Sequence, residues 1–269
     1  MRAEAAWRMP LATGLAMAGL LVLAAAAAPW LAAHPPDAID FLALQQPPSA
    51  VHPLGTDQYG RDVLSRILHG ARLVLLVAPA ATALGLALGS LLGLAAAYAG
   101  GWRDEALMRA LDGAMALPTV ILAMLVLTAL GPSTVNVVLV IGLAFAPLVA
   151  RSVRAAALAE ARKEYVLAAQ MRGESTAYIL VFEILPNIYP VLLVEASLRL
   201  GYAIFTAATL GFLGLGAQPP TPDWGLMVSE SQALLTVAPW LVLAPVAAIA
   251  YAVIAVALIA DGVQALLDR

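Results

Sequence analysis

Long stretches without a charged side chain are the feature that most limits how this sequence can fold. Uncharged runs of 28, 30, 38 and 30 residues follow Arg8, Arg72, Asp112 and Glu230. A helix of about 20 apolar residues crosses the ~30 Å hydrocarbon layer of a bilayer and satisfies its own backbone hydrogen bonds there. Charged residues make up only 12% of the 269-residue chain, about half of the roughly 25% share in soluble domains. The sequence therefore predicts an all-α membrane protein.

The uncharged runs predict six transmembrane helices, near residues 11–33, 73–99, 114–130, 135–149, 188–210 and 239–260. The cluster Gly131-Pro132-Ser133 divides the third helix from the fourth, because these residue types favour a turn. The first apolar run is longer than the 7–15 residues of a signal-peptide core, so we expect it to remain as an anchor.

The positions of Lys and Arg predict the orientation, since basic residues are retained in cytoplasmic loops. With the N-terminus inside, ten of the 14 basic residues are cytoplasmic, three are external and Arg199 lies within a span. An even number of spans then places both termini in the cytoplasm. The whole chain, 1–269, is expected to be one transmembrane domain with an external segment at 34–72, a cytoplasmic loop at 151–187 and an external loop at 211–238.

The cytoplasmic loop contains two short helical segments. Residues 160–172 are helix formers without Gly or Pro, and Tyr165, Ala168, Ala169 and Arg172 have the spacing of one helix face. Gly173 is expected to end this helix. Ser175 can cap a second helix through Phe182, which Pro186 limits. The small residues permit close approach by a partner, while the alternative is an ordinary polar connector on the lipid headgroups.

Tyr165-Val166-Leu167-Ala168-Ala169-x-x-x-Gly173, followed by Ile184-Leu185-Pro186-Asn187, resembles the "EAA" loop in the membrane subunits of bacterial binding-protein-dependent ABC importers. The resemblance covers nearly the whole chain and is specific to the C-type permease subunits of dipeptide, oligopeptide and nickel importers. Its further motifs are His52 to Arg66, Met108-Arg109-x-x-Asp112 with Pro118, Leu210 to Gly216, Pro219 to Gly225 and Asp261-Gly262. Two positions depart from the pattern: Leu167 replaces a Glu and Glu183 replaces a His.

The resemblance implies the type I ABC importer permease fold and a multi-pass location in the bacterial inner membrane. It implies that the loop is a coupling helix that sits in a groove of a cytoplasmic ATPase. That role would fall on Glu164, Tyr165, Ala168, Ala169, Arg172, Gly173, Glu174 and Ser175. The implied partners are a second homologous permease subunit, one or two ATP-binding subunits and an external substrate-binding protein, and the implied substrates are dipeptides or oligopeptides.

Catalytic, cofactor and metal sites are not expected in the chain. Its single lysine, Lys163, stands in no Gly-rich Gly-Lys-Ser/Thr sequence, so ATP hydrolysis is expected on partner subunits. The absence of Cys removes thiol catalysis and Cys-ligated metals. His34, His52 and His69 have no tight ligand spacing. A net charge of −3 gives no support for nucleic-acid binding.

Glu195 and Arg199 are expected inside the fifth span, one helical turn apart on the same face. Charges within a membrane are costly and mark functional sites by default. Two interpretations stay open: a pair that stabilises the bundle, or a pair with a role in the pathway or its gating.

Three alternatives to a peptide importer subunit follow from the sequence. A nickel or metal-chelate importer permease belongs to the same family. A self-sufficient channel or secondary transporter fits six spans equally well but does not require the Ala168-Ala169-x-x-x-Gly173 loop. An intramembrane enzyme has no His-Glu-x-x-His or Gly-x-Gly-Asp sequence to support it. In this architecture the substrate is selected largely by the binding protein and by a cavity shared with the second permease.

Overall fold

The computed structural model describes residues 8–267, and it confirms the predicted all-helical fold. The long helices are α2 (Arg8–Leu31), α3 (Val63–Ala99), α6 (Thr134–Glu160), α10 (Tyr189–Phe212) and α12 (Trp240–Leu267). The shorter elements are α4 (Gly101–Met115), α5 (Thr119–Leu130), α7 (Glu164–Met171), α8 (Thr176–Tyr178), the π-helix η1 (Ile179–Ile184), α9 (Leu185–Asn187), α11 (Trp224–Ser231) and the 3-10 helix η2 (Gln232–Leu234). Among the described residues, the five long helices are apolar enough to cross a membrane, and α4 with α5 makes a sixth candidate.

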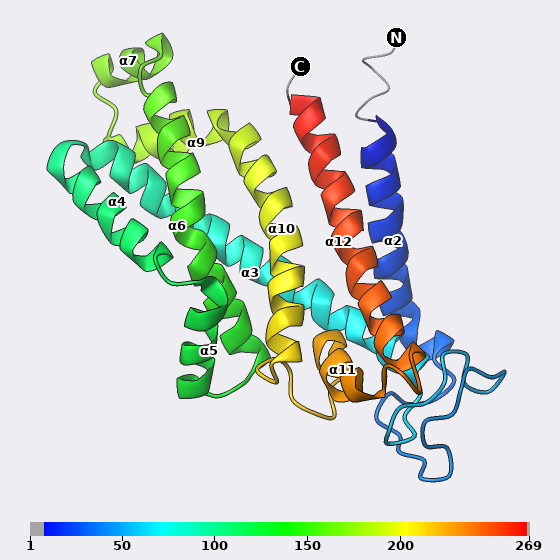
Figure 1. Cartoon of the computed structure of the whole chain (residues 1–269). Helices are drawn as coiled ribbons and strands as arrows, with labels where there is room; N and C mark the ends of the chain where they lie inside the picture. The colour runs from blue at the N-terminus through cyan, green and yellow to red at the C-terminus, as the bar shows by residue number, and fades with distance from the viewer. Residues whose placement is uncertain (1–7, 268–269) are drawn as a thin grey trace.

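The long helices form one bundle whose two ends differ (Figure 1). The start of α2, the end of α12 and the short helix α7 lie at one end. The 34–62 segment and α11 lie at the other. Helix α3 runs obliquely through the bundle and packs against α6, α10 and α2. The loop that contains α7 and the segment that packs with α11 therefore lie at opposite ends of the bundle.

The contact between α3 and α6 is built on glycine. Gly85, Gly89 and Gly93 recur every four residues along α3 and are all buried. A Cβ at Gly89 would lie 2.7 Å from the Ala146 carbonyl oxygen, and one at Gly93 would lie 2.6 Å from the Ala150 carbonyl oxygen. These carbonyl oxygens belong to the backbone of α6, so they cannot move aside for a larger side chain without distorting that helix. Small residues let helices approach closely in lipid, where dispersion and packing replace the hydrophobic effect.

The third expected span, 114–130, is not one straight helix. It is interrupted at Ala116 to Pro118, and α4 and α5 meet there at 81°. Proline has no N–H to donate and its ring disfavours helical geometry for the residue before it, which favours a break at Pro118. With 12 residues, α5 rises only roughly 18 Å at 1.5 Å per residue. It is too short to cross the hydrocarbon layer without help from α4.

Two other helices are longer than expected. The second span, expected to begin at residue 73, begins ten residues earlier, because Val63 to Arg72 form the first turns of the continuous helix α3. Asp62 caps that helix by accepting a 2.7 Å hydrogen bond from the Ser65 backbone N–H. The fourth span, expected to end at Val149, continues through the Ala-rich sequence to Glu160 because Val153 and Ala157 are fully buried on its inner face.

Charge pairs fasten the 34–62 segment to the rest of the protein. Arg61 Nε lies 2.6 Å from Asp57 Oδ2, and Arg61 Nη2 lies 2.9 Å from Oε2 of Glu230 on α11. Arg66 is 1% exposed and its Nε lies 3.8 Å from the same Asp57 oxygen. Because Arg61 bonds both acids, the segment and α11 are held together as one cap at this end of the bundle.

A glycine substitution tests the α3–α6 contact. We expect Gly89→Val to destabilise the protein by about 1–3 kcal/mol, the usual cost of an overpacked core, since the added methyls meet Val149 and the Ala146 carbonyl. Gly19→Ala is the matched control, because nothing lies within 4 Å of its Cβ position. Thermal unfolding in detergent measures both. Equal melting temperatures for Gly89→Val and the wild type would contradict the packing described.

Candidate coupling loop and intramembrane charge pair

The loop that follows α6 is a compact structure stabilised by its own apolar core. Val166 and Ala169 on α7 are fully buried and pack with Val153 and Ala157 of α6 and with Ile184 of η1. Ala169 therefore faces inward, whereas Ala168 is exposed. The expected common face of small residues is split between the inside and the outside of the loop.

The exposed side of α7 is apolar. Leu167 is 48% exposed and Met171 is 89% exposed. They are four residues apart, so they lie on one face of the helix next to Ala168. Glu164 and Arg172, at the two ends of α7, are also exposed. An exposed apolar helix face with charges at its ends is typical of a surface that a partner covers.

Polar contacts tie α7 to the end of α6. The Tyr165 hydroxyl donates a 3.0 Å hydrogen bond to Oε1 of Glu160, which is 8% exposed, and Lys163 Nζ lies 2.8 Å from Glu160 Oε2. Burial and the bond to Glu160 raise the pKa of Tyr165 to about 12. The hydroxyl therefore keeps its proton and remains a donor at physiological pH.

The turn after α7 has the expected capping residues. Gly173 has φ +79, a left-handed conformation that favours glycine, and the Glu174 backbone N–H donates a 3.2 Å bond to the Ala169 carbonyl. Ser175 caps α8 by accepting a 3.3 Å bond from the Tyr178 N–H. The turn reverses the chain and returns it to the membrane bundle.

The helical segment after Ser175 differs from the expectation that Pro186 limits it near Phe182. It continues as α8, η1 and α9 to Asn187. The π-helix has a physical cause: in an α-helix the Pro186 ring would clash with the Phe182 carbonyl. The wider helix avoids this, with the Leu185 N–H donating to the Leu180 carbonyl five residues back. Pro186 thus changes the helix type without ending it.

Glu183, which stands where the family pattern has His, has a partner in this protein. Its carboxylate Oε1 lies 3.2 Å from Arg172 Nη2, and Arg172 Nε lies 3.7 Å from Glu174 Oε1. The pair joins the end of α7 to η1. Because Arg172 is 54% exposed, we expect this exposed pair to contribute only ~0–1 kcal/mol to stability.

The structure places Glu195 and Arg199 together on α10. Arg199 Nε lies 2.9 Å from Glu195 Oε2, and the Ser152 hydroxyl of α6 donates a 2.6 Å bond to the other carboxylate oxygen. Glu195 is 8% exposed. Ser152 was not identified from the sequence, because the fourth span was expected to end before it and because its bond to Glu195 joins two helices 43 residues apart in the chain.

Two of the family motifs, Leu210 to Gly216 and Pro219 to Gly225, meet at the opposite end of the bundle, around Asp223. This carboxylate accepts bonds from the backbone N–H groups of Gly225 and Leu226, at 2.8 and 3.2 Å, and of Ala217, at 3.4 Å. Burial raises the pKa of Asp223. A Cβ at Gly216 would lie 2.6 Å from its Oδ2. The glycine is therefore needed to leave room for the carboxylate.

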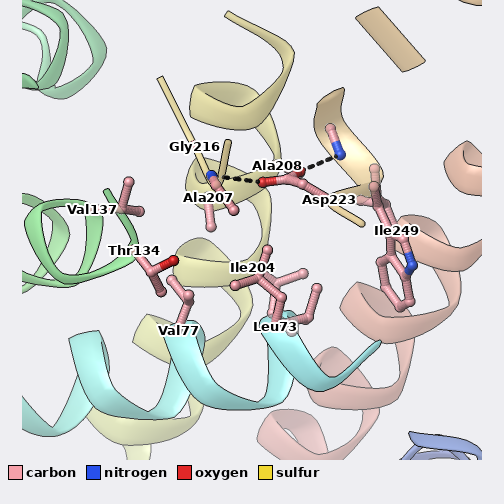
Figure 2. Close-up of a pocket in the computed structure, with 14 residues that line it drawn as sticks. Leu73, Val77, Thr134, Val137, Ile204, Ala207, Ala208, Gly216, Asp223 and Ile249 are labelled. Carbon is pink, nitrogen blue, oxygen red and sulfur yellow. Dashed lines mark hydrogen bonds between the residues drawn. The ribbon is translucent and has the colours of Figure 1, made fainter. Parts of the chain in front are cut away.

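Figure 2 shows Asp223 between the loop at Gly216 and the start of α11, beside a small cavity. The cavity measures about 30 Å³ and is lined mainly by apolar residues of α3, α6, α10 and α12, among them Val77, Val137 and Ile204. It is large enough for about one or two water molecules, so it is a packing defect rather than a substrate site.

Comparison with known proteins assigns the chain to a family. The family model described as "Binding-protein-dependent transport system inner membrane component" matches residues 85–269. The chain is 41% identical over 249 residues to the "Probable D,D-dipeptide transport system permease protein" of Escherichia coli K12, covering 93% of this chain and 84% of that protein. It is 39% identical over 261 residues to the "Di/tripeptide transport system permease protein" of Pseudomonas aeruginosa, covering 95% and 86%.

A third relative is the "Glutathione transport system permease protein" of Pectobacterium atrosepticum, 38% identical over 268 residues, which cover 97% of this chain and 89% of that protein. The family match spans more than half of the chain, and these relatives are aligned over most of their own length. This protein therefore belongs to the family of inner membrane components of binding-protein-dependent transport systems.

Proposed function

We propose that this chain is the permease subunit of an ATP-driven importer of peptides, and that α7 is its docking element for a cytoplasmic ATP-binding subunit. The observation that carries the docking role is the exposed apolar face of α7, with Leu167 and Met171, held rigidly at the end of α6. The peptide substrate is supported by relatives named for D,D-dipeptides, for di- and tripeptides and for glutathione.

The proposed orientation places the α7 end in the cytoplasm. The start of α2, helix α4, the last part of α6 and the α7 loop together carry eight of the 14 basic residues, which favours the cytoplasmic side for them. The start of α2 and the end of α12 lie at the same end (Figure 1). Both termini of the chain would then be cytoplasmic, and the 34–62 segment with α11 would face the substrate-binding protein.

The proposed assembly is the chain with a second homologous permease, one or two ATP-binding subunits and an external substrate-binding protein. The permease itself is proposed to be non-catalytic, with ATP hydrolysed by its partners. Within the chain, movement of α7 would reach α6 through Glu160 and Tyr165, and would reach η1 and α10 through Arg172 and Glu183. These links couple the docking surface to two membrane helices.

Import by the reconstituted complex tests the function. We expect proteoliposomes with both permeases, the ATP-binding subunits and the binding protein to accumulate a labelled dipeptide against its gradient when ATP is supplied. Nickel replaces the dipeptide in a parallel assay, where no uptake is expected. Uphill uptake by vesicles that lack the ATP-binding subunits would instead indicate a secondary transporter.

Substitution at the exposed face tests docking. We expect Met171→Gln to weaken binding of the ATP-binding subunit about tenfold, a typical cost for an interface anchor, because Met171 is the most exposed apolar side chain of α7. Met9→Gln is the matched control: Met9 is 74% exposed, at the start of α2. Titration of the purified permease with its ATP-binding subunit measures both. An equal loss in the two variants would contradict a specific docking role for α7.

Removal of the Tyr165 hydroxyl tests whether the bond between α7 and α6 couples ATP hydrolysis to import. Tyr165→Phe keeps the exposed face of α7 but loses the bond to Glu160, so we expect binding of the ATP-binding subunit to persist while peptide imported per ATP hydrolysed falls. Tyr251→Phe is the control, since its hydroxyl donates a 3.0 Å bond to the Met17 carbonyl far from the loop. Both variants should lose about 1 kcal/mol of stability. An unchanged import-to-ATP ratio for Tyr165→Phe would show that the bond is only structural.

A further inference from the structure

The Glu195–Arg199 pair lies near the middle of a membrane-spanning helix. Arg199 follows the first residue of the 24-residue helix α10 by ten positions, which is roughly 15 Å along the axis at 1.5 Å per residue. Charged side chains at such depth face the interior of a bundle or a water-filled cavity. In many transporters the substrate site also lies near the midplane. The location alone therefore makes the pair a candidate contact for cargo.

Glu195 and Arg199 differ in how many of their polar atoms have hydrogen-bond partners. Both carboxylate oxygens of Glu195 are occupied, one by Arg199 Nε and one by the Ser152 hydroxyl. The guanidinium of Arg199 uses only Nε, and within residues 8–267 neither terminal amino group has a hydrogen-bond partner. Its side chain is 15% exposed. Glu195 thus fixes the guanidinium at Nε and leaves the two terminal amino groups available for another ligand.

The open side of Arg199 borders an exposed row of α10. Its guanidinium carbon lies 5.8 Å from the ring centre of Tyr202, which is 59% exposed, and 5.7 Å from that of Phe145 on α6. The row continues with Phe205, and two hollows of about 290 and 390 Å³ lie along it between α10 and α12. Figure 1 shows α10 between α6 and α12.

Unpaired amino groups of an arginine are not stable against lipid tails, because no acceptor replaces their lost hydration. Arg199 is therefore a polar point on a mainly apolar row, and its amino groups require water or a polar ligand opposite them. A planar guanidinium with two free amino groups matches a carboxylate, which it binds with two parallel hydrogen bonds.

We propose that Arg199 binds the C-terminal carboxylate of a peptide as it passes through the membrane. Glu195, itself held by the Ser152 hydroxyl, keeps the guanidinium in place, and Tyr202 lies beside the bound group. This inference rests on the proposed function as a peptide importer. A free carboxylate is common to peptides of every side-chain composition, so one contact serves many substrates. Glu195 balances the charge of Arg199 beforehand, which keeps binding weak enough for release.

Import by the complete complex with Arg199→Lys tests the site. Lysine keeps a positive charge next to Glu195 but loses the planar fork, so we expect initial dipeptide import to fall about tenfold, the usual loss for a charge-assisted hydrogen bond. Peptide affinity of the separate binding protein stays unchanged. Arg109→Lys is the matched control, because Arg109 pairs with Glu105 at the same four-residue spacing, 2.6 Å apart, but is 77% exposed on α4. Wild-type import by Arg199→Lys would overturn the inference.

Photo-cross-linking locates the peptide independently of rate and folding. A photoreactive residue at Tyr202 should form an adduct with labelled dipeptide during import, and one at Ile254, exposed on α12, serves as the position control. Adding Arg199→Lys should reduce the adduct at 202 about tenfold. Import without an adduct at 202, or an adduct that Arg199→Lys does not reduce, overturns the inference and leaves the importer function standing. A wild-type complex that imports no peptide overturns the proposed function itself, and this inference with it.

Discussion

Close contact between α3 and α6 determines where the other helices can lie. Lipid tails are as apolar as the helix surfaces, so burial from water gives little force to hold helices together inside a bilayer. The glycines at 85, 89 and 93 replace that force with close backbone packing against residues 142–154 of α6. Helix α10 then packs against both α3 and α6, and α12 against α10 and α2. Without that first contact, the later ones would have no fixed support.

Much of the membrane architecture could be predicted, because charges avoid the hydrocarbon layer and their spacing marks the helices. Five of the six expected spans overlap the long helices, and the residues named for the loop turn, Gly173 and Ser175, occupy the turn and the cap. The one-turn spacing of Glu195 and Arg199 was enough to place them side by side. These features depend on local spacing or local backbone geometry, which a single sequence shows directly.

Features that depend on packing between distant segments were not predictable in this way. Pro118 favours a break between α4 and α5, but the 81° angle between them depends on how they pack against α3 and α6. The inward direction of Ala169 and the outward direction of Leu167 depend on the core between α6 and η1. Glu183 could be recognised as a departure from the family pattern, but its partner Arg172 is 11 residues away and on another element. Tertiary contacts decided all three.

Helix α6 joins both ends of the protein in one continuous piece. It has 27 residues and so measures roughly 40 Å at 1.5 Å per residue. Its glycine-lined contact with α3 includes Gly142 and extends to Arg154. Because this contact lies around the middle of α6, the helix would tilt about it. A tilt of about ten degrees there displaces each end by roughly 3.5 Å, in opposite directions, for arms of about 20 Å. In the proposed importer, a small movement of α7 would therefore be transmitted through α6 to the opposite end of the bundle.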